Sequence, residues 1–469
     1  MGLRPRLPTP RGRLMPTPEE SREFANGVVR RLRGAGFEAL WAGGCVRDLT
    51  LGLAPTDYDV ATDARPEQVM GLYPKRTVPV GESFGVVRVR GPHRSGHEVE
   101  VATFRSDGAY VDGRRPESVV FSSPRLDAER RDFTINGMFY DPFKEEVIDY
   151  VGGLADLRAR VIRAIGDPVA RFREDKLRLL RAGRFAARFG FVIEPGTLAA
   201  LVSMADQISV VAVERVAQEL RRMLVGATRS RAMSLMMDTG LMAAVLPPVV
   251  AMKGLFQGKP VQPEGDLWDH TLLVLDLLPE SPSFPLAFAA LLHDVGKPDT
   301  RGLHHGKVCF HNHEQMGRAI AGDLCRRLKL SNSERERVSW LVEYHQYLGE
   351  AKKLREAKLK RTLAMPGIEE LLALHRADAL ASHGEASQVD YCEYYLKAEP
   401  AGPINPPPLL TGHDLARHGI HQGPVFKVIL DGVREAQLER QIGSKREALE
   451  WIDLRLAAGE FVENEEKDR

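Results

Sequence analysis

Residues 41–60 constrain what this chain can fold into more than any other stretch of the sequence. An apolar run ends at Gly43 and Gly44, and two adjacent glycines let the backbone approach a phosphate closely and present its N–H groups. Asp57 and Asp59 follow, separated by one residue. On a β-strand, residues two apart point to the same side, so both carboxylates would serve as hard oxygen ligands for Mg²⁺. The stretch therefore predicts a phosphate-binding turn beside a magnesium site.

A third carboxylate is expected on a neighbouring strand. Acidic and apolar residues alternate in 98–101, which is typical of a half-buried strand, and Glu100 is the predicted third ligand of a two-metal site. Each feature has an ordinary alternative, because a glycine pair usually marks a turn and an Asp-x-Asp sequence usually lies in a solvated loop. The spacing of the whole set favours a site for nucleotide polymerisation.

Short β-rich segments surround these residues at 39–42, 58–61, 85–89 and 99–103, and a helix is expected near 66–73. A further helix is expected before them, within residues 19–34. This pattern predicts a small mixed sheet with helices on one side.

The segment 130–136 alternates apolar residues with groups that can reach a nucleotide. Arg131 can grip a phosphate or stack on a base, while Asp132 and Asn136 offer hydrogen bonds to a ribose hydroxyl. The segment therefore predicts sugar selection. For Arg130 a surface ion pair is the favoured alternative, so it is left out of the predicted nucleotide site.

From residue 167 onward the pattern changes to long, arginine-rich helices. One helix is expected to begin near Arg173 and to place Glu174, Asp175 and Arg178 on one side. Such a cluster would present an acceptor and a donor to the Watson–Crick edge of a base, as a template strand does. Standing alone, the same pattern is more typical of a salt bridge on a solvated helix face.

Five motifs in this order resemble the class II tRNA nucleotidyltransferase and bacterial poly(A) polymerase family: the glycine pair, Arg47-Asp48, residues 56–59, residues 130–136 and residues 174–178. The resemblance implies an α/β nucleotidyltransferase head followed by mostly α-helical neck, HD and C-terminal domains. It also implies addition of CCA to the 3′ end of tRNA from CTP and ATP, with Mg²⁺ and without a nucleic-acid template. Residues 214–220 match a further motif, which is expected to brace the template helix by ion pairs. The implied nucleotide-binding residues are Gly43, Gly44, Arg47, Arg131, Asp132, Asn136, Glu174, Asp175, Arg178, Arg181 and Arg184.

A second cluster of candidate residues lies on helical patterns in the C-terminal half. Its order resembles the HD phosphohydrolase superfamily, in which histidines and aspartates from separate helices hold a divalent cation that activates water against a phosphate ester. The implied metal ligands are His270, His293, Asp294 and Asp378, with His313 and His345 as further candidates. Two alternatives remain: the histidines are packed core residues, or the domain supports tRNA without hydrolysing anything.

Length and charge limit the class of protein. With 469 residues and 43% hydrophobic content, the chain can bury several cores. The expected divisions are a disordered leader (1–18), a head (19–150), a neck (151–260), an HD domain (261–400) and a C-terminal tRNA-binding module (401–469). No apolar run is long enough to span a membrane, no signal peptide is recognisable and the four cysteines are scattered, so we expect a cytoplasmic protein. Because the net charge is +1, any nucleic-acid surface must come from local segregation of charge.

Two further segments bear on specificity. Residues 103–116 match the flexible loop that family members need to add the terminal adenosine, with an ordinary surface hairpin as the alternative. Its presence disfavours a CC-only enzyme. Residues 406–436 contain two expected helices with glycine turns and resemble the tRNA-contacting module of the family; a capping bundle without a ligand is the alternative. The rival functions are a poly(A) polymerase or A-only enzyme, an HD phosphohydrolase with a vestigial head, and an RNA-binding protein without activity.

Overall fold

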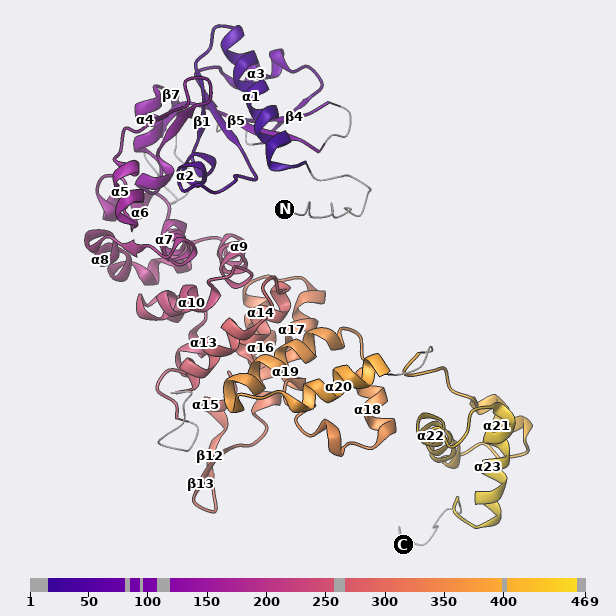
Figure 1. The fold of residues 1–469 in the computed structure, drawn as a ribbon. Coiled ribbons are helices and arrows are strands. Elements are labelled where there is room, and N and C mark those ends of the chain that lie inside the picture. The colour runs from indigo at the N-terminus through magenta and orange to yellow at the C-terminus, as the bar shows by residue number, and fades with distance from the viewer. Residues whose placement is uncertain are drawn as a thin grey trace. The chain divides into compact units, whose positions relative to one another are not determined.

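The computed structural model describes residues 16–80, 85–92, 96–107, 119–256, 266–398 and 403–461. The chain divides into two compact units, which are described one at a time: Met1–Ala251 with Arg326–Leu330, and Met252–Cys325 with Ser331–Arg469. Figure 1 shows most of the strands in the first part of the chain and mostly helices after it. Within the described ranges, no helix is both long and apolar enough to cross a membrane. Most of the expected leader lies outside these ranges, and Pro18 already begins a helix.

The head is built on a mixed sheet of seven strands with the order β3-β4-β5-β2-β1-β8-β9. Strands β2 and β5 are parallel, whereas the other neighbouring pairs are antiparallel. The predicted mixed sheet is therefore confirmed, although the three-residue strands β3, β8 and β9 are too short to show an alternating pattern and were not predicted. The strands are β1 (Ala39–Ala42), β2 (Asp59–Thr62), β3 (Thr77–Pro79), β4 (Val86–Arg90), β5 (Glu98–Thr103), β8 (Phe139–Asp141) and β9 (Glu146–Ile148).

The register of the central strands brings two predicted carboxylates together. Asp59 lies opposite Glu100 in the parallel β2–β5 pair, and Arg88 on β4 lies opposite Glu100 in the neighbouring antiparallel pair. Asp57 is not on the strand: it lies in the loop that leads into β2, which begins at Asp59. The prediction that strand alternation aligns both aspartates is therefore wrong, and Asp57 is positioned by the loop.

Helices cover β1 on both faces, so the prediction of helices on one side of the sheet is wrong. On one face, Arg22 of helix α1 (Pro18–Gly34) lies over the ring of Trp41, with its Cζ 5.8 Å from the ring centroid. On the other face, Leu40 and Ala42 pack in one core cluster with Ala128 of helix α4 (Pro124–Glu129). All four residues of β1 are buried. An uninterrupted apolar strand is the sequence pattern of burial on both faces, and it indicated this arrangement.

The neck is helical, but its predicted template helix is broken. Helix α6 ends at Glu174, Asp175 is extended (φ −144°, ψ 102°), and helix α7 begins at Leu177. The Asp175 carboxylate accepts a hydrogen bond from the backbone N–H of Leu177 (3.1 Å), the local bond by which aspartate competes with a continuing helix. The helices of the first unit are α1 (Pro18–Gly34), α2 (Gly44–Thr50), α3 (Pro66–Leu72), α4 (Pro124–Glu129), α5 (Gly153–Ala159), α6 (Pro168–Glu174), α7 (Leu177–Phe189), α8 (Pro195–Ser203), α9 (Val213–Leu224), α10 (Arg229–Asp238), α11 (Leu241–Val245) and α12 (Pro247–Val250).

The predicted flexible loop begins and ends in a short antiparallel ladder. Strands β6 (Arg105–Asp107) and β7 (Val119–Phe121) pair with Arg105 opposite Phe121. This ladder agrees with the hairpin alternative at the base of the segment. Residues 108–118, which carry most of the predicted loop, lie outside the described residues.

The second unit places the predicted metal ligands at the ends of packed helices. Helix α14 is apolar throughout and buried at every position except Pro285, and its C-terminal end leads directly into His293 and Asp294. Helices α13 and α19, which carry His270 and Asp378, pack against each other. The helices after Met252 are α13 (Leu267–Leu277), α14 (Phe284–Leu292), α15 (Lys297–Thr300), α16 (His313–Arg327), α17 (Asn332–Tyr344), α18 (Glu356–Leu363), α19 (Ile368–His383), α20 (Ser387–Ala398), α21 (Gly412–Arg417), α22 (Val425–Leu438) and α23 (Lys445–Ala457).

The C-terminal segment forms a small helical core of its own. Leu415 of α21, Ile429 and Val433 of α22 and Ile452 of α23 belong to one buried cluster. The two predicted helices correspond to α21 and α22, whereas α23 was not predicted. Helix α23 completes the core that the other two helices expose.

Candidate functional site

A cavity of about 1050 Å³ in the first unit collects most of the predicted nucleotide-binding residues. Its walls come from the Gly43-Gly44 turn, the segment 130–136, helix α7 and helix α9. Glu100, Asp57 and Glu174 lie outside the lining that the described residues form. The predicted residues that line it are Gly43, Gly44, Arg47, Asp59, Arg131, Asp132, Asn136, Asp175, Arg178, Arg181 and Arg184.

Gly43 is needed because an arginine lies against its backbone. Its φ is +71°, a conformation that residues with a side chain rarely adopt. A Cβ at this position would lie 2.9 Å from Nη1 of Arg131, which itself donates a hydrogen bond to the carbonyl oxygen of Asn136 (3.3 Å). A larger residue would displace Arg131 from the cavity wall.

The carboxylates beside this turn form an electrostatically strained group. Desolvation by the surrounding protein raises the pKa of Asp59 to about 6, and the negative charges of Glu100 and Asp57 add to the rise while Arg131 opposes it. Glu100 is partly neutralised by Arg88, whose Nη2 lies 2.8 Å from its Oε1. Acidic oxygens held together at this cost are a donor set that fits a divalent cation, which would replace their repulsion by attraction.

A second group of acidic residues is fully paired with arginines. Asp127 is 1% exposed and accepts from both Arg130 (2.6 Å) and Arg131 (2.9 Å). Asp132 accepts from Nη2 of Arg181 (2.6 Å) and from Nδ2 of Asn136 (3.0 Å). Burial alone would raise the pKa of Asp132, but the charge of Arg181 and the hydrogen bond from Asn136 lower it to about 2. The ion-pair alternative, which the sequence reserved for Arg130, thus describes Arg131 as well.

Arg47 forms part of the cavity wall through buried contacts. Its Nη1 donates to Oδ1 of Asn136 (2.6 Å), and its Nη2 lies 2.6 Å from Oδ1 of Asp48. Its guanidinium carbon lies 5.2 Å and 4.7 Å from the ring centroids of Phe185 and Phe189. Arg47 therefore ties the head turn to helix α7 by cation–π contacts.

The predicted template residues are held by neighbours of the neck. Arg178 donates from Nη1 to Oε2 of Glu174 (2.7 Å) and from Nη2 to the carbonyl oxygen of Arg130 (3.0 Å). Asp175 accepts two hydrogen bonds from Arg215 of α9 (2.7 and 3.1 Å), so the predicted brace by residues 214–220 is confirmed as an ion pair. Arg178 and Asp175 are thus each held in place by contacts within the protein.

A second link joins α7 to α9 deeper in the neck. Glu219 is 1% exposed and accepts from Nε of Arg184 (2.5 Å) and from Nη1 of Arg222 (2.8 Å). Arg184 also lies over the ring of Phe185, with its Cζ 4.1 Å from the centroid. This contact fixes the wall of the cavity at predicted residue Arg184.

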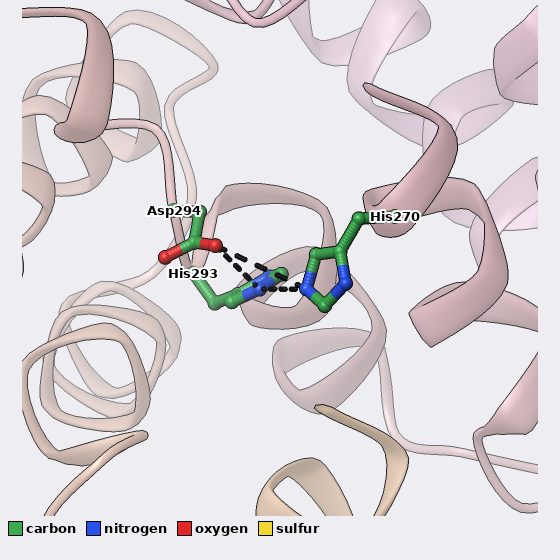
Figure 2. A group of neighbouring side chains, drawn as sticks. All are labelled: His270, His293 and Asp294. Carbon is green, nitrogen blue, oxygen red and sulfur yellow. Dashed lines mark hydrogen bonds and ion pairs between the residues drawn. The ribbon is translucent and has the colours of Figure 1, made fainter. Parts of the chain in front are cut away.

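The second unit contains a buried cluster of histidines around one carboxylate. Figure 2 shows His270, His293 and Asp294 converging, with Nε2 of His293 lying 3.2 Å from both Nε2 of His270 and Oδ2 of Asp294. Nε2 of His313 and Nε2 of His345 lie 3.4 and 3.5 Å from the other Asp294 oxygen. The sequence-predicted ligands are therefore brought together, and Asp294 is shared by two groups that could each hold a metal ion.

The outer ring nitrogens of these histidines determine where their lone pairs point. Nδ1 of His293, His313 and His345 lies 2.7–2.9 Å from the carbonyl oxygens of residues 290, 310 and 342, respectively. Because a carbonyl can only accept, each Nδ1 donates to its carbonyl, and Nε2 of each ring points toward Asp294 as the nitrogen available to a metal. Asp294 Oδ1 and Nε2 of His313 and His345 have no hydrogen-bond partner. Converging lone pairs of this kind fit a divalent metal.

Asp294 stays ionised within this cluster. Burial would raise its pKa, but Lys297, with Nζ 2.6 Å from Oδ2, and His293 hold the pKa well below its usual range. Burial would also raise the pKa of Asp378, but the hydrogen bond from His270, whose Nε2 lies 3.2 Å from its Oδ1, and the charges of His293 and His345 together lower it. Two anionic carboxylates therefore accompany the histidines.

Three contributing residues were missed by sequence reasoning. Asp127 holds Arg130 and Arg131, Lys297 holds Asp294, and buried His375 has its Nδ1 2.8 Å from the carbonyl oxygen of His345. A helical spacing of three or four residues from a predicted site residue could have identified Asp127 and Lys297. No sequence signal links His375 to His345, because that contact joins separate helices.

Three family models match the chain, in the order of its structural parts. The Poly A polymerase head domain matches residues 39–163, the probable RNA and SrmB-binding site of polymerase A matches 190–252, and the HD domain matches 267–382. The first two lie in the unit that holds the cavity, and the third contains the histidine cluster. The matches agree with the order of the predicted parts.

Known proteins similar to the chain are CCA-adding enzymes. The enzyme of Anoxybacillus flavithermus is 32% identical over 434 residues, covering 91% of this chain and 96% of that protein. The enzyme of Limosilactobacillus fermentum is 44% identical over 222 residues, but this match covers 47% of the chain and spans about half (54%) of that protein. The crystal structure of the Bacillus stearothermophilus CCA-adding enzyme in complex with CTP has a TM-score of 0.71 and 26% identity, covering 94% of this chain and 98% of that one.

Proposed function

Because the chain belongs to the CCA-adding enzyme family, we propose that it adds C, C and A to the 3′ end of tRNA from CTP and ATP, without a nucleic-acid template. The observation that carries the proposal is the cavity that joins Asp59, the close-approach Gly43 and the donor–acceptor pair Arg178 and Asp175. The similar Bacillus stearothermophilus enzyme is known in complex with CTP. The cytoplasmic location that the sequence predicts is part of this proposal, as are the predicted domain divisions.

Asp57, Asp59 and Glu100 are proposed to hold the divalent cation that the family uses, and we assign Mg²⁺ because carboxylate oxygens are its preferred ligands. When bound, such ions stabilise charge on the attacking and leaving oxygens of phosphoryl transfer. Gly43 keeps the wall beside these residues free of a side chain. Asp132 and Asn136, which hydrogen-bond each other, are assigned to the ribose.

Base selection is assigned to Asp175 and Arg178. Cytosine and adenine both combine an amino donor with a ring-nitrogen acceptor on the Watson–Crick edge, so one carboxylate acceptor and one guanidinium donor match both. Uracil and guanine carry a donor on the ring nitrogen and an oxygen in place of the amino group, so the same pair faces them with the wrong polarity. Arg215 holds Asp175 in place, which lowers the cost of orienting it for a base.

The test is single-nucleotide addition to tRNA that ends before CCA, with labelled CTP and ATP. We expect ordered addition of two C residues and one A, and abolition of both by Asp57→Ala or Asp59→Ala while tRNA affinity is retained. Glu98→Gln is the matched control, because this neighbouring strand carboxylate pairs with Arg90 (3.1 Å). Extended runs of A would favour the poly(A) polymerase alternative, and addition restricted to a tRNA ending in CC would favour the A-only enzyme.

A second activity is favoured by the unpartnered lone pairs around Asp294. The proposed HD ligands are His270, His293, Asp294 and Asp378, with His313 and His345 completing the second group around the shared carboxylate. A divalent metal held there would activate water against a phosphate ester. Metal-dependent release of phosphate from a 3′-phosphomonoester tests this function. Tight metal binding without any hydrolysis would instead support a structural role.

A further inference from the structure

The β12–β13 hairpin connects two elements that carry residues of the HD cluster. It consists of β12 (Arg301–His304) and β13 (Lys307–Phe310), with His304 opposite Lys307 in the register. His305 and Gly306 both have positive φ (49° and 74°), which makes a tight two-residue turn. The hairpin projects beyond helix α15 (Figure 1).

The base of the hairpin is in contact with the HD cluster. The carbonyl oxygen of Phe310 lies 2.9 Å from Nδ1 of His313 and so orients that imidazole. The Phe310 ring lies 5.7 Å from Nζ of Lys297, whose ammonium group bonds Asp294 (2.6 Å). A molecule bound along the hairpin would therefore lie next to the cluster.

The hairpin has the charge and exposure of a nucleic-acid contact. Residues 301–312 contain no aspartate or glutamate, two cations and three exposed histidines, His304, His305 and His311. Leu303 is 78% exposed, and the rings of His304 and His305 lie 4.3 Å apart. Lysine, arginine and imidazole N–H groups donate to phosphate oxygens, while exposed flat rings can stack on unpaired bases.

A cavity beside the HD cluster has a largely polar lining. It has a volume of about 550 Å³ and is lined by Lys297, Asp378 and a set of Ser, Gln, Glu and His side chains. Its described lining includes no Phe, Tyr or Trp that could form a stacking platform for a base. The Ser, Gln and His side chains can hydrogen-bond the hydroxyls of a sugar, whereas this lining offers a base no stacking contact, so contacts outside the cavity would add to the affinity for a polynucleotide.

We propose that the β12–β13 hairpin binds the ribose-phosphate backbone of an RNA strand and makes the HD centre selective for a phosphoester at the end of a polynucleotide over a free mononucleotide. This inference rests on the proposed HD hydrolase activity. In the reaction, a water oxygen forms a new bond to phosphorus, the bond from phosphorus to the ribose 3′ oxygen breaks, and that oxygen takes a proton from water. No oxidant or reductant is required.

The experiment compares kcat/KM for a 3′-phosphorylated RNA hexamer and for the nucleoside 3′-phosphate of its last residue, using the full chain, Mn²⁺ and no nucleoside triphosphate. The variant is His304→Gln with Lys307→Gln. The matched control is Lys397→Gln with His421→Gln, which removes the same side chains from exposed positions elsewhere in the second unit. We expect a roughly tenfold loss on the hexamer and no loss on the mononucleotide in the variant, and neither loss in the control. The salt dependence of log kcat/KM on the hexamer should fall by about 0.7 for each lost phosphate contact.

Equal losses on both substrates, or no loss on the hexamer, would overturn the inference while leaving the HD hydrolase intact. If the wild-type chain hydrolyses neither substrate, the proposed HD function fails, and hydrogen exchange then tests the hairpin separately. Protection of the 301–310 amides by the unhydrolysed hexamer, lost in the variant, would retain the RNA contact. Absence of that protection in the wild-type chain would reject it.

Discussion

In the wall of the proposed nucleotide cavity, Asp132 and Asp175 are held by arginines, whereas in the HD cluster Asp294 is surrounded by imidazole nitrogens. Asp132, for example, accepts from Arg181 and Asn136, so its charge and its hydrogen-bonding groups are satisfied by protein alone. Nε2 of His313 and Nε2 of His345 lie beside Asp294 Oδ1, and none of the three atoms has a hydrogen-bond partner. These carboxylates of the cavity wall are satisfied without a ligand, whereas the HD cluster needs a cation.

This difference between the two sites agrees with how long each ligand is expected to stay bound. In the proposed function a nucleotide enters and leaves at every addition, so an ion-pair network that keeps the cavity in shape between cycles would limit the cost of ordering side chains. A metal can remain bound through many cycles, and buried lone pairs without donors penalise its loss. We therefore expect metal to stabilise the second unit and nucleotide to stabilise the first much less.

The two sites should respond most differently to a substitution of Asp294, the carboxylate shared by both halves of the HD cluster. Asp294→Asn should lower metal-dependent phosphate release by at least about 10³-fold, because losing a metal ligand costs several kcal/mol in the transition state. Nucleotide addition to tRNA should stay within about twofold. The measurements are the rate of phosphate release and the melting temperature of the wild-type chain and the variant, each with and without Mn²⁺.

Asp299→Asn provides the matched control for this change, since Asp299 is exposed on the short helix after the cluster. It should keep both the hydrolysis and the rise in melting temperature with Mn²⁺. A folded Asp294→Asn variant that loses nucleotide addition as well would show that the two sites are not independent.

A substitution of Glu219 tests whether the ion pairs of the cavity wall stabilise the first unit without a ligand. Glu219→Gln leaves the buried guanidinium of Arg184 without its anion, and breaking a buried pair in this way costs about 3–5 kcal/mol. Urea unfolding of the first unit, followed without nucleotide or metal, should show this loss. Glu214→Gln is the control, because the exposed Glu214–Lys329 pair on the surface should contribute no measurable stability. Equal urea midpoints for Glu219→Gln and Glu214→Gln would contradict a stabilising role for the buried ion pairs.

The two sites also differ in how much of them the sequence predicted. The structure brings together the residues predicted as HD ligands, because each lies on a helix or directly after its C-terminal end, and helix packing places these positions side by side. The carboxylates of the head were predicted from strand spacing, which holds for Glu100 but not for Asp57, whose loop has no periodicity. Patterns within one regular element predicted positions best.

What the sequence could not predict depends on contacts between distant elements or on local competition. The break at Asp175 arises because its side chain bonds the N–H of Leu177, a choice that helix spacing does not reveal. The burial of β1 on both faces was indicated by its four apolar residues, and was overlooked in favour of a one-sided sheet. Long-range partners such as Arg215 for Asp175 were suggested by a motif and not by any physical pattern.

A smaller effect is expected at the proposed protein template. Arg178→Ala should raise misincorporation of UTP and GTP relative to CTP and ATP by about 10- to 100-fold, since a bidentate base contact contributes about 1–3 kcal/mol of discrimination. Single additions of each triphosphate to tRNA ending in CC and to tRNA lacking CCA measure it. Arg173→Ala is the control, because Arg173 is an exposed arginine on the preceding helix. Unchanged preference in the Arg178 variant would make the cluster structural.

The smallest effect concerns protons at the head carboxylates. The pKa of Asp59 is raised to about 6, so below that pH the side chain carries a proton that a metal must displace. At subsaturating Mg²⁺, nucleotide addition should fall about tenfold for each pH unit below 6, and saturating Mg²⁺ should shift this fall to lower pH. The Asp132–Arg181 pair should not interfere above about pH 5, because the lowered pKa of Asp132 (about 2) keeps its stabilising contribution in full until the pH approaches the ordinary carboxyl pKa near 4, and the contribution is lost as the pH falls from there through about 2. A pH profile that does not move with Mg²⁺ would show that proton and metal do not compete at Asp59. The acidic residues of the head would then resemble the paired carboxylates of the cavity wall more than the metal-dependent cluster around Asp294.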